Sequence, residues 1–170
     1  MGSLTSNFYS QKHQKNKSNQ NRKKNNSHVL EQRSRRPIYR NNLPNNHIRI
    51  NHKNNNYHYN NGNYYTYSNN QYRLIYPNRG LRIQHLPIGY RTIIIGQRER
   101  YYYNGIFYNR KGNEFEVIDP PLGSIVPEIP LESSTAILIG DKSYYQYNSI
   151  LFEPISTVEG VQYRVVEKYQ

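Results

Sequence analysis

The C-terminal half of this 170-residue sequence repeats a three-part pattern after about 44 residues. An isoleucine-rich run ends in glycine, a tyrosine-rich run contains a turn, and a short alternating run completes the unit. The first copy comprises residues 93–96, 101–108 and 115–117, and the second comprises 137–140, 144–152 and 163–165. Each copy is too short to bury its own apolar side, so we expect the two copies to pack together.

The repeated region has the composition of β-structure. From Leu81 onward, short runs of β-branched and aromatic residues alternate with glycine, proline and asparagine, and no stretch keeps a helical period. The sequence therefore predicts an all-β fold with two tandem repeats that contain β-hairpins, at residues 81–126 and 127–170. The pattern leaves open whether they form one small sheet, a sandwich or a partly open barrel.

The clearest hairpin signal is Asn104-Gly105. Both central residues of a type I′ turn have positive φ, which asparagine and glycine tolerate. Asn148 and Ser149 occupy the same place in the second copy, so we assign a structural turn role to all four residues. The predicted cross-strand pairs of the first copy are Tyr103 with Ile106, Tyr102 with Phe107, and Tyr101 with Tyr108.

The two faces of this hairpin are predicted to differ in burial. Alternation places Tyr101, Tyr103, Ile106 and Tyr108 on one face and Tyr102 with Phe107 on the other. The matching second face in the second copy carries the polar Gln146, which favours solvent exposure. We therefore predict a core on the first face and treat Tyr102 and Phe107 as exposed aromatic binding candidates. The uninterrupted apolar runs 93–95 and 137–139 are predicted to be central strands.

Charge divides the chain into two parts. Residues 1–80 contain 14 basic residues and one acidic residue, whereas residues 81–170 contain 9 basic and 10 acidic residues. The first part also holds 20 of the 24 asparagines and few aliphatic residues. Such a segment buries too little apolar surface to offset the entropy of ordering. We therefore predict a largely disordered tail over residues 1–80, in which the alternating runs 47–50 and 72–76 could add edge strands.

The basic tail is the strongest interaction signal. Dense cations bind polyanions by releasing counterions, and tyrosine rings offer faces on which bases or sugars stack. The partner is nucleic acid, anionic polysaccharide or lipid headgroups, and the competing interpretation is a solubilising extension. The predicted polyanion-binding residues are Lys12, Lys15, Lys17, Arg22, Lys23, Lys24, Arg33, Arg35, Arg36 and Arg40. The tyrosines considered for stacking are Tyr57, Tyr59, Tyr64, Tyr65 and Tyr67.

Three histidines of the tail, His47, His52 and His58, are weak candidates for a transition-metal site. Their spacings of five and six match no standard site, and the sequence contains no cysteine, so we assign no metal and no other cofactor. Residues 81–170 contain one histidine, His85, and no pattern that marks a catalytic triad or a phosphate-binding loop. We therefore expect no enzyme.

Several motifs occur in a specific order, and together they resemble the bacterial domain-of-unknown-function family numbered 6515 over residues 81–168. The sequence departs from the family pattern at residues 132–134 and at Ser149. The resemblance implies a small β-rich protein of the periplasm or cell envelope, because this family strings such units together, commonly behind a secretory leader. It also implies an envelope protein as a partner, and it carries over no catalytic residue. The motifs are Leu86-Pro87-Ile88-Gly89-Tyr90-Arg91-Thr92, Phe115-Glu116-Val117-Ile118-Asp119-Pro120-Pro121-Leu122-Gly123 and Tyr163-Arg164-Val165-Val166-Glu167-Lys168.

These observations predict a noncatalytic envelope-associated structural or binding module with a cationic, polyanion-binding tail. Two alternatives remain open: a cytosolic nonspecific nucleic-acid-binding protein and a metal-handling protein that uses the histidines of the tail. No apolar run is long enough to cross a bilayer, and the N-terminus lacks the apolar core of a signal peptide. Met1-Gly2-Ser3 is compatible with a scar that replaces a leader, which would make this an exported protein; because the given sequence shows no signal peptide, a cytoplasmic location is retained as the alternative.

Overall fold

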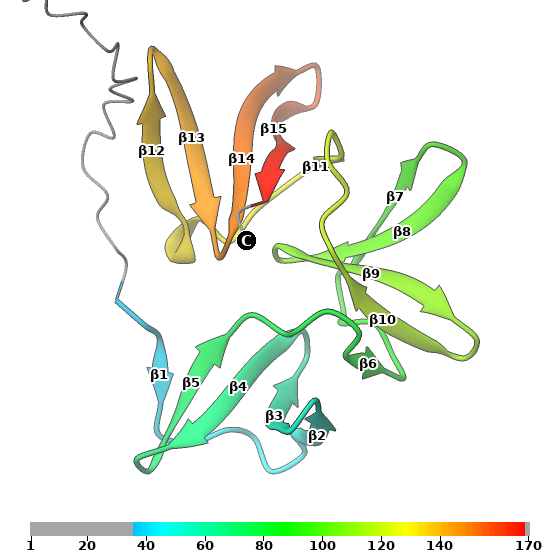
Figure 1. Ribbon diagram of the computed structural model, residues 1–170, viewed down its shortest axis with the longest axis vertical. Coiled ribbons are helices and arrows are strands. Elements are labelled where there is room, and N and C mark those ends of the chain that lie inside the picture. The colour runs from blue at the N-terminus through cyan, green and yellow to red at the C-terminus, as the bar shows by residue number, and fades with distance from the viewer. Residues whose placement is uncertain (1–35, 169–170) are drawn as a thin grey trace, which may run out of the picture.

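Three sheets, each of five antiparallel strands, make up the computed structural model, which describes residues 36–168 (Figure 1). Within these residues, the one helical segment is the short 3₁₀ turn η1 (Leu131–Ser133). The all-β prediction is therefore confirmed. The number of repeats is three instead of two, because residues 39–75 form a sheet of their own. The prediction of a disordered tail over residues 1–80 is wrong for this segment, while residues 1–35 lie outside the described part of the chain.

The three units share one topology. In each, four strands form an antiparallel meander, and a short first strand pairs with the last one. The first unit (residues 36–78) contains β1 (Tyr39–Arg40), β2 (Ile48–His52), β3 (Asn55–Asn60), β4 (Asn63–Ser68) and β5 (Gln71–Ile75). The second (79–121) contains β6 (Arg82–Ile83), β7 (Arg91–Ile95), β8 (Arg98–Tyr103), β9 (Ile106–Lys111) and β10 (Glu114–Ile118). The third (122–168) contains β11 (Ile125–Val126), β12 (Thr135–Ile139), β13 (Lys142–Tyr147), β14 (Ile150–Thr157) and β15 (Gly160–Lys168).

The boundary between the second and third units differs from the predicted one. Ile125 and Val126 pair with Arg164 and Tyr163, so β11 belongs to the third sheet and the boundary precedes it. The repeat length is 43 residues, as the matched prolines Pro44, Pro87 and Pro130 show. A short strand that pairs only with the end of its own unit carries too little local pattern to be assigned from sequence.

Asparagine supports the first sheet instead of interrupting it. Asn54, Asn61, Asn69 and Asn70 all have positive φ and lie in the turns between its strands. Asparagine tolerates this left-handed conformation better than most residues. The strands between these turns are built on tyrosine in place of isoleucine and valine, which explains why the region has the composition of a tail but folds as a sheet.

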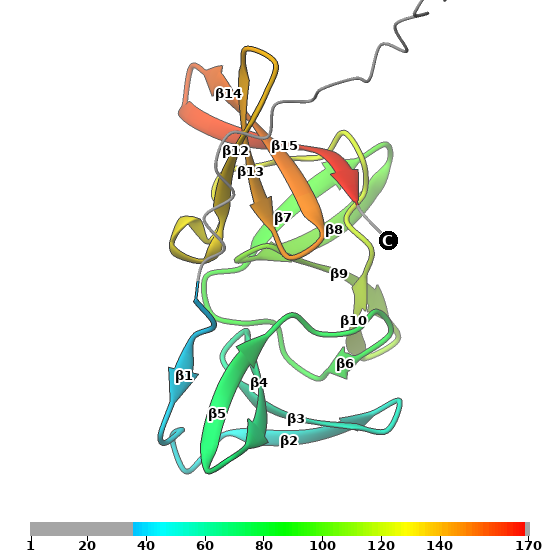
Figure 2. The same ribbon diagram turned by 60° about the vertical axis from the view of Figure 1, so that its left-hand side comes forward.

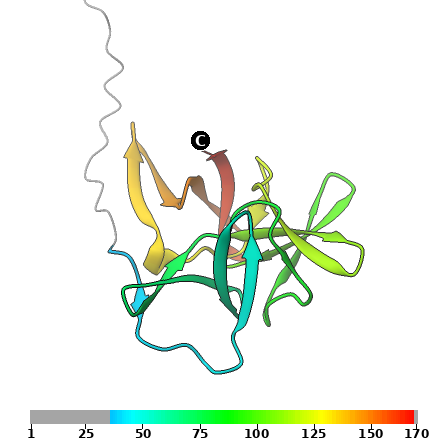
Figure 3. The same ribbon diagram turned by 60° about the horizontal axis from the view of Figure 1, so that its bottom comes forward.

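The units lie around a common centre (Figure 1). After a turn about the vertical axis, the first unit lies at one end of the molecule and the third at the other (Figure 2). Viewed from below, the first unit lies in front, with the third and second units to either side (Figure 3). The second unit thus has a neighbour on each side.

Two hydrophobic clusters result from this arrangement. One joins the first and second units through Tyr57, Tyr59, Tyr64, Leu81, Ile83, Ile106, Tyr108 and Val117. The other joins the second and third units through Tyr102, Phe107, Val126, Ile129, Ile150, Phe152, Tyr163 and Val165. The second sheet therefore contributes side chains from both of its faces to buried cores.

The predicted exposure of Tyr102 and Phe107 is wrong, because both side chains are 0% exposed. They pack against the third unit, while Ile106 and Tyr108 on the opposite face pack against the first. The cross-strand pairs themselves are those predicted, since Tyr102 pairs with Phe107 and Tyr103 with Ile106. Register follows from the local turn, whereas burial depends on neighbours that the turn does not specify.

The two isoleucine-rich runs also differ from expectation. Residues 93–95 lie in β7 and 137–139 in β12, and both strands are sheet edges instead of central strands. Ile94 is 65% exposed. Apolar runs of this length do not by themselves distinguish a central strand from an edge strand.

Buried tyrosines connect the units near the centre. The hydroxyls of Tyr64 and Tyr108 lie 3.2 Å apart, and the Tyr76 hydroxyl donates a hydrogen bond to the Gly105 carbonyl at 3.2 Å. Burial raises the pKa of the Tyr64, Tyr76 and Tyr108 hydroxyls well above 10, and it raises the pKa of Tyr147 to about 12. These phenols are therefore neutral hydrogen-bonding groups at neutral pH.

Candidate functional site

One face of the first sheet carries a cluster of basic and aromatic side chains that points away from the core shared with the second unit. Residues directly paired across antiparallel strands share a face, and the register pairs Arg49 with His58, Tyr67 with Tyr72, and Arg40 with Tyr72. His47, two residues before Arg49, joins them through ring contacts. We call this set the aromatic face; it consists of Arg40, His47, Arg49, His58, Tyr67 and Tyr72.

The rings of the aromatic face contact one another in series. Ring centroids lie 5.0 Å apart for His47 and His58, 5.0 Å for His58 and Tyr72, and 4.7 Å for Tyr67 and Tyr72. These separations are within the range of favourable aromatic packing. His58 is 9% exposed and Tyr67 is 50% exposed. The cluster is therefore buried at His58 and accessible to solvent at the ring of Tyr67.

The two histidines form a hydrogen-bonded pair. His47 Nδ1 lies 2.8 Å from the Pro44 carbonyl oxygen, and because a carbonyl only accepts, this nitrogen carries the proton. His47 Nε2 lies 3.0 Å from His58 Nδ1, so a proton on one of these two nitrogens joins the two rings. Burial lowers the pKa of His58, and the nearby charges of His47 and Arg49 lower it further.

The first unit has an unbalanced charge. Residues 36–78 contain five basic residues and no acidic residue, and none of the five forms an ion pair with a described residue. In the other two units, by contrast, Glu116 binds Arg82 and Lys111, and Glu153 binds Lys142 and Arg164. Among the described residues, the cations of the first unit therefore have no carboxylate counterion.

The structure places some of the sequence-predicted binding residues and not others. Arg40 lies in β1 on the aromatic face, and Arg36 is exposed just before that strand. Of the tyrosines considered for stacking, Tyr67 is accessible. Tyr57, Tyr64 and Tyr65 are buried, so their predicted stacking role is wrong. Tyr59 is 7% exposed and lines a cavity between the first and second units. The predicted cations outside the described residues are Lys12, Lys15, Lys17, Arg22, Lys23, Lys24, Arg33 and Arg35.

The candidate metal ligands separate into two places. His47 and His58 are paired on the aromatic face, whereas His52 Nε2–H donates to the Arg79 carbonyl at 3.2 Å, where the first unit meets the second. Within residues 36–168, no group of three or more histidine, aspartate or glutamate residues is placed to hold a metal ion. The predicted turn residues lie in turns, where Asn104, Gly105 and Asn148 have positive φ and Ser149 does not.

Sequence reasoning missed Arg49 and Tyr72 as members of this face. The alternation in residues 47–50 and 72–76 was a signal for the two strands that carry them. The pairing of residues 49 and 58, and that of 40 and 72, depends on which strands are neighbours, which the sequence did not specify.

The fold and this face define a three-unit, all-β protein with a basic aromatic surface. The chain matches the family of unknown function DUF6515 over residues 36–169 and belongs to this family. The family resemblance is therefore confirmed, and the match also covers the first unit. Comparisons with curated proteins and with solved structures find no match. Within the described residues, no helix has the length and apolar character needed to span a membrane.

Proposed function

We propose that this protein is a noncatalytic structural or binding module of the bacterial cell envelope, which binds polyanions through the aromatic face and the basic residues before it. The observation that carries the proposal is the acid-free first unit, whose cations have no ion-pair partner among the described residues. Arg40 and Arg49 lie on either side of the ring cluster on the same face of the sheet. A polyanion laid across this face would contact two guanidinium groups and a tyrosine edge.

Binding of this kind draws its free energy from charge and stacking. Each cation that neutralises a charge of the polymer releases condensed counterions, so affinity falls steeply as salt rises. Guanidinium groups form bidentate hydrogen bonds with phosphate and carboxylate oxygens. Tyr67 supplies an accessible ring on which a sugar or a base can stack. We therefore expect this face to select polymers by their charge density and not by their monomer sequence.

The surroundings of the histidine pair support a noncatalytic role. His47 and His58 contact each other, the Pro44 carbonyl and the rings of Tyr67 and Tyr72. A catalytic base ordinarily bonds a nucleophile on one side and an orienting carboxylate on the other. The partners of this pair are instead a carbonyl and aromatic rings, which hold the imidazoles in place.

The envelope location is proposed on the family resemblance, since this family commonly carries a secretory leader. Fractionation of the native host, followed by determination of the protein's N-terminus, tests it. Recovery in the envelope fraction with a processed N-terminus supports the proposal. Recovery in the cytosol with an unprocessed N-terminus contradicts it and favours the alternative of a cytosolic nucleic-acid-binding protein.

Polyanion binding is tested on the full chain with Arg40→Gln/Arg49→Gln. Binding to an anionic polysaccharide, to phosphatidylglycerol vesicles and to a short single-stranded DNA is measured by fluorescence anisotropy or sedimentation as salt rises. For the DNA probe, the slope of log K against log salt is expected to become shallower by about 1 to 2, because up to two phosphate contacts are lost.

The matched control is Arg91→Gln/Arg98→Gln, which removes the same charge from exposed positions of the second unit. This control is expected to keep the wild-type salt slope, and an equal loss in both variants would contradict a binding role for the aromatic face. Tighter binding of DNA than of polysaccharide and vesicles at equal ionic strength would favour the nucleic-acid alternative.

A further inference from the structure

A cavity of about 480 Å³ lies between the first and second units, away from the aromatic face. One wall comes from β2 and β3 with the loop before β2, and the other from residues 82–88 that follow the start of the second unit. Its volume falls in the range of about 300–1,000 Å³ typical of small-molecule sites. The apolar part of the lining consists of Ile48, Ile50, Tyr59, Ile83, Leu86 and Ile88.

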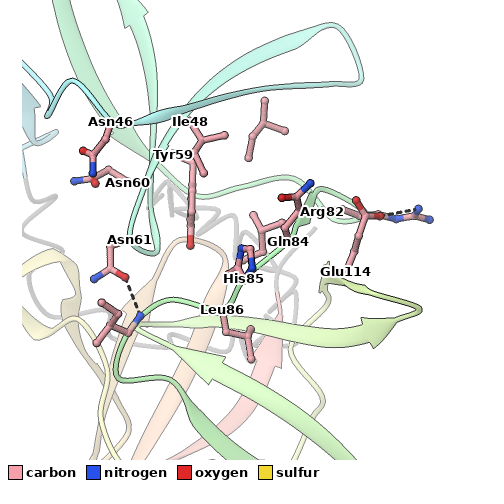
Figure 4. A pocket seen from close by; sticks show the side chains of 13 residues that line it. Asn46, Ile48, Tyr59, Asn60, Asn61, Arg82, Gln84, His85, Leu86 and Glu114 are labelled. Atoms are coloured by element: carbon pink, nitrogen blue, oxygen red, sulfur yellow. Dashed lines mark hydrogen bonds and ion pairs between the residues drawn. The ribbon is translucent and has the colours of Figure 1, made fainter.

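Polar side chains face each other across this cavity. Figure 4 shows Asn46 and Asn60 on one side and Gln84 and His85 on the other, with the Tyr59 ring between them. None of these four polar side chains has a hydrogen-bond partner among the described residues. Asn61, by contrast, has a hydrogen-bond partner, because its Oδ1 accepts from the Ile88 backbone N–H at 2.8 Å. This bond links the two walls of the cavity.

The charges in the lining are already paired. Arg82 lies 3.4 Å from a Glu114 oxygen and 3.0 Å from a Glu116 oxygen. These contacts raise the pKa of Arg82 and, together with Lys111, lower the pKa of Glu116, so both groups stay charged and satisfied. The cavity therefore presents neutral hydrogen-bonding groups to an occupant and no free ion.

The repeat provides an internal comparison, because the junction between the second and third units is built from the matching positions 43 residues later. There Pro127 stands at the position of Gln84, whereas Tyr103, at the position of Asn60, packs back against the first unit. The Tyr102 hydroxyl donates to the Glu128 carbonyl at 2.5 Å, and Val126 is fully buried beneath it.

The second junction shows that this fold closes a junction with aromatic and aliphatic packing. It needs no amide at the position that matches Gln84. The amide of Gln84 is therefore not explained by the demands of the fold, and with that of Asn60 it borders an open cavity instead of a packed junction.

We propose that this cavity binds a neutral saccharide. A sugar ring presents C–H groups on its faces and hydroxyls at its edges, and each hydroxyl both donates and accepts. The Tyr59 ring with the aliphatic floor matches the first property, and the amides of Asn46, Asn60 and Gln84 match the second, since each amide also donates and accepts. The paired state of Arg82 leaves no charge that would select an anion, which separates this site from the polyanion-binding face.

The test is a titration of the full chain with neutral oligosaccharides of glucose and of N-acetylglucosamine, followed by ¹H–¹⁵N NMR. Saturable shifts are expected in the side-chain amide signals of Asn46, Asn60 and Gln84, and the affinity is expected to be insensitive to salt. The variant Asn60→Ala/Gln84→Ala is expected to bind about tenfold more weakly or worse, since it removes two hydrogen-bonding groups from the site.

The matched control is Gln97→Ala/Asn113→Ala, which removes two exposed amides from turns of the second unit; it should bind like the wild type. A second variant, Asn60→Tyr, places a large ring at a residue that lines the cavity and is expected to block it while the other backbone signals keep their positions. The proposal is overturned if no saccharide produces saturable shifts, or if Asn60→Ala/Gln84→Ala binds as the control does. Shifts produced by a neutral tripeptide but by no saccharide would also overturn it.

Discussion

The substitution Gly105→Ala tests how the second and third units are docked. Gly105 lies in the turn between β8 and β9 with φ +87°. A Cβ atom at this position would lie 2.4 Å from a ring carbon of Tyr147 and 3.4 Å from Cδ of Pro130. The first distance is well below any normal carbon contact, so either the ring or the turn must move.

The expected loss of stability has two parts. A left-handed backbone costs a residue with a Cβ about 1–2 kcal/mol relative to glycine. Forcing a methyl group into a packed contact costs about 1–3 kcal/mol. Tyr147 has little freedom to yield, because its ring also packs against that of Tyr76, with centroids 5.9 Å apart. The two parts together predict a decrease of about 2–5 kcal/mol in the free energy of unfolding.

Gly112→Ala separates these two parts. Gly112 also has positive φ, +65°, but a Cβ there would meet no atom within 4 Å. This control carries the backbone term alone, about 1–2 kcal/mol. The assay is urea unfolding of wild type and both variants by far-ultraviolet circular dichroism and tyrosine fluorescence, with agreement of the two probes as the check on two-state behaviour.

The difference between the two variants measures the contact between units. We expect Gly105→Ala to be less stable than Gly112→Ala by about 1–3 kcal/mol. Equal losses would mean that Tyr147 does not press on this turn, and the docking of the second unit against the third would have to be revised.

Two further predictions concern buried polar groups. Tyr64→Phe leaves the buried Tyr108 hydroxyl without its partner and should lower the free energy of unfolding by about 1–3 kcal/mol, whereas Tyr64→Phe/Tyr108→Phe should lose less than the single variant. A double variant that is less stable than either single variant in urea unfolding would refute this. Because the pKa of folded His58 lies below its ordinary 6.5, the unfolded chain binds more protons, so stability should be full above pH 6.5 and fall as the pH drops through the folded value. Urea midpoints measured between about pH 5 and 7.5 should show this decline and should lose most of it in His58→Phe; a flat wild-type profile would contradict the prediction.

Local turn chemistry was readable in the sequence. Asn104-Gly105 specifies a two-residue turn, and the observed pairs Tyr102 with Phe107 and Tyr101 with Tyr108 follow directly from it. The all-β class was equally accessible, because no stretch of the chain keeps a helical period. These features depend on residues that are close in the sequence.

Features that depend on distant neighbours were not accessible. The first sheet was missed because tyrosine replaces isoleucine in β3 and β4 and asparagine fills the turns, a composition that also describes disordered chains. Because the first unit was not predicted, the second sheet was assigned only one buried face. Tyr102 and Phe107 were placed on the face predicted to be exposed to solvent. The aromatic face and the cavity at the first junction depend on which strands are neighbours and how units dock, so their members could be named only in part.

The described strands pair only within their own unit, and this has a consequence for folding during synthesis. All strand ladders among residues 36–168 join strands of the same unit, so each sheet can form as soon as its own segment has left the ribosome. The first sheet, however, has few aliphatic residues and buries Tyr57 and Tyr64 against Ile106 and Tyr108 of the next unit. We therefore expect the nascent first unit to be paired but loosely packed until the second emerges, and to be the segment most dependent on uninterrupted translation.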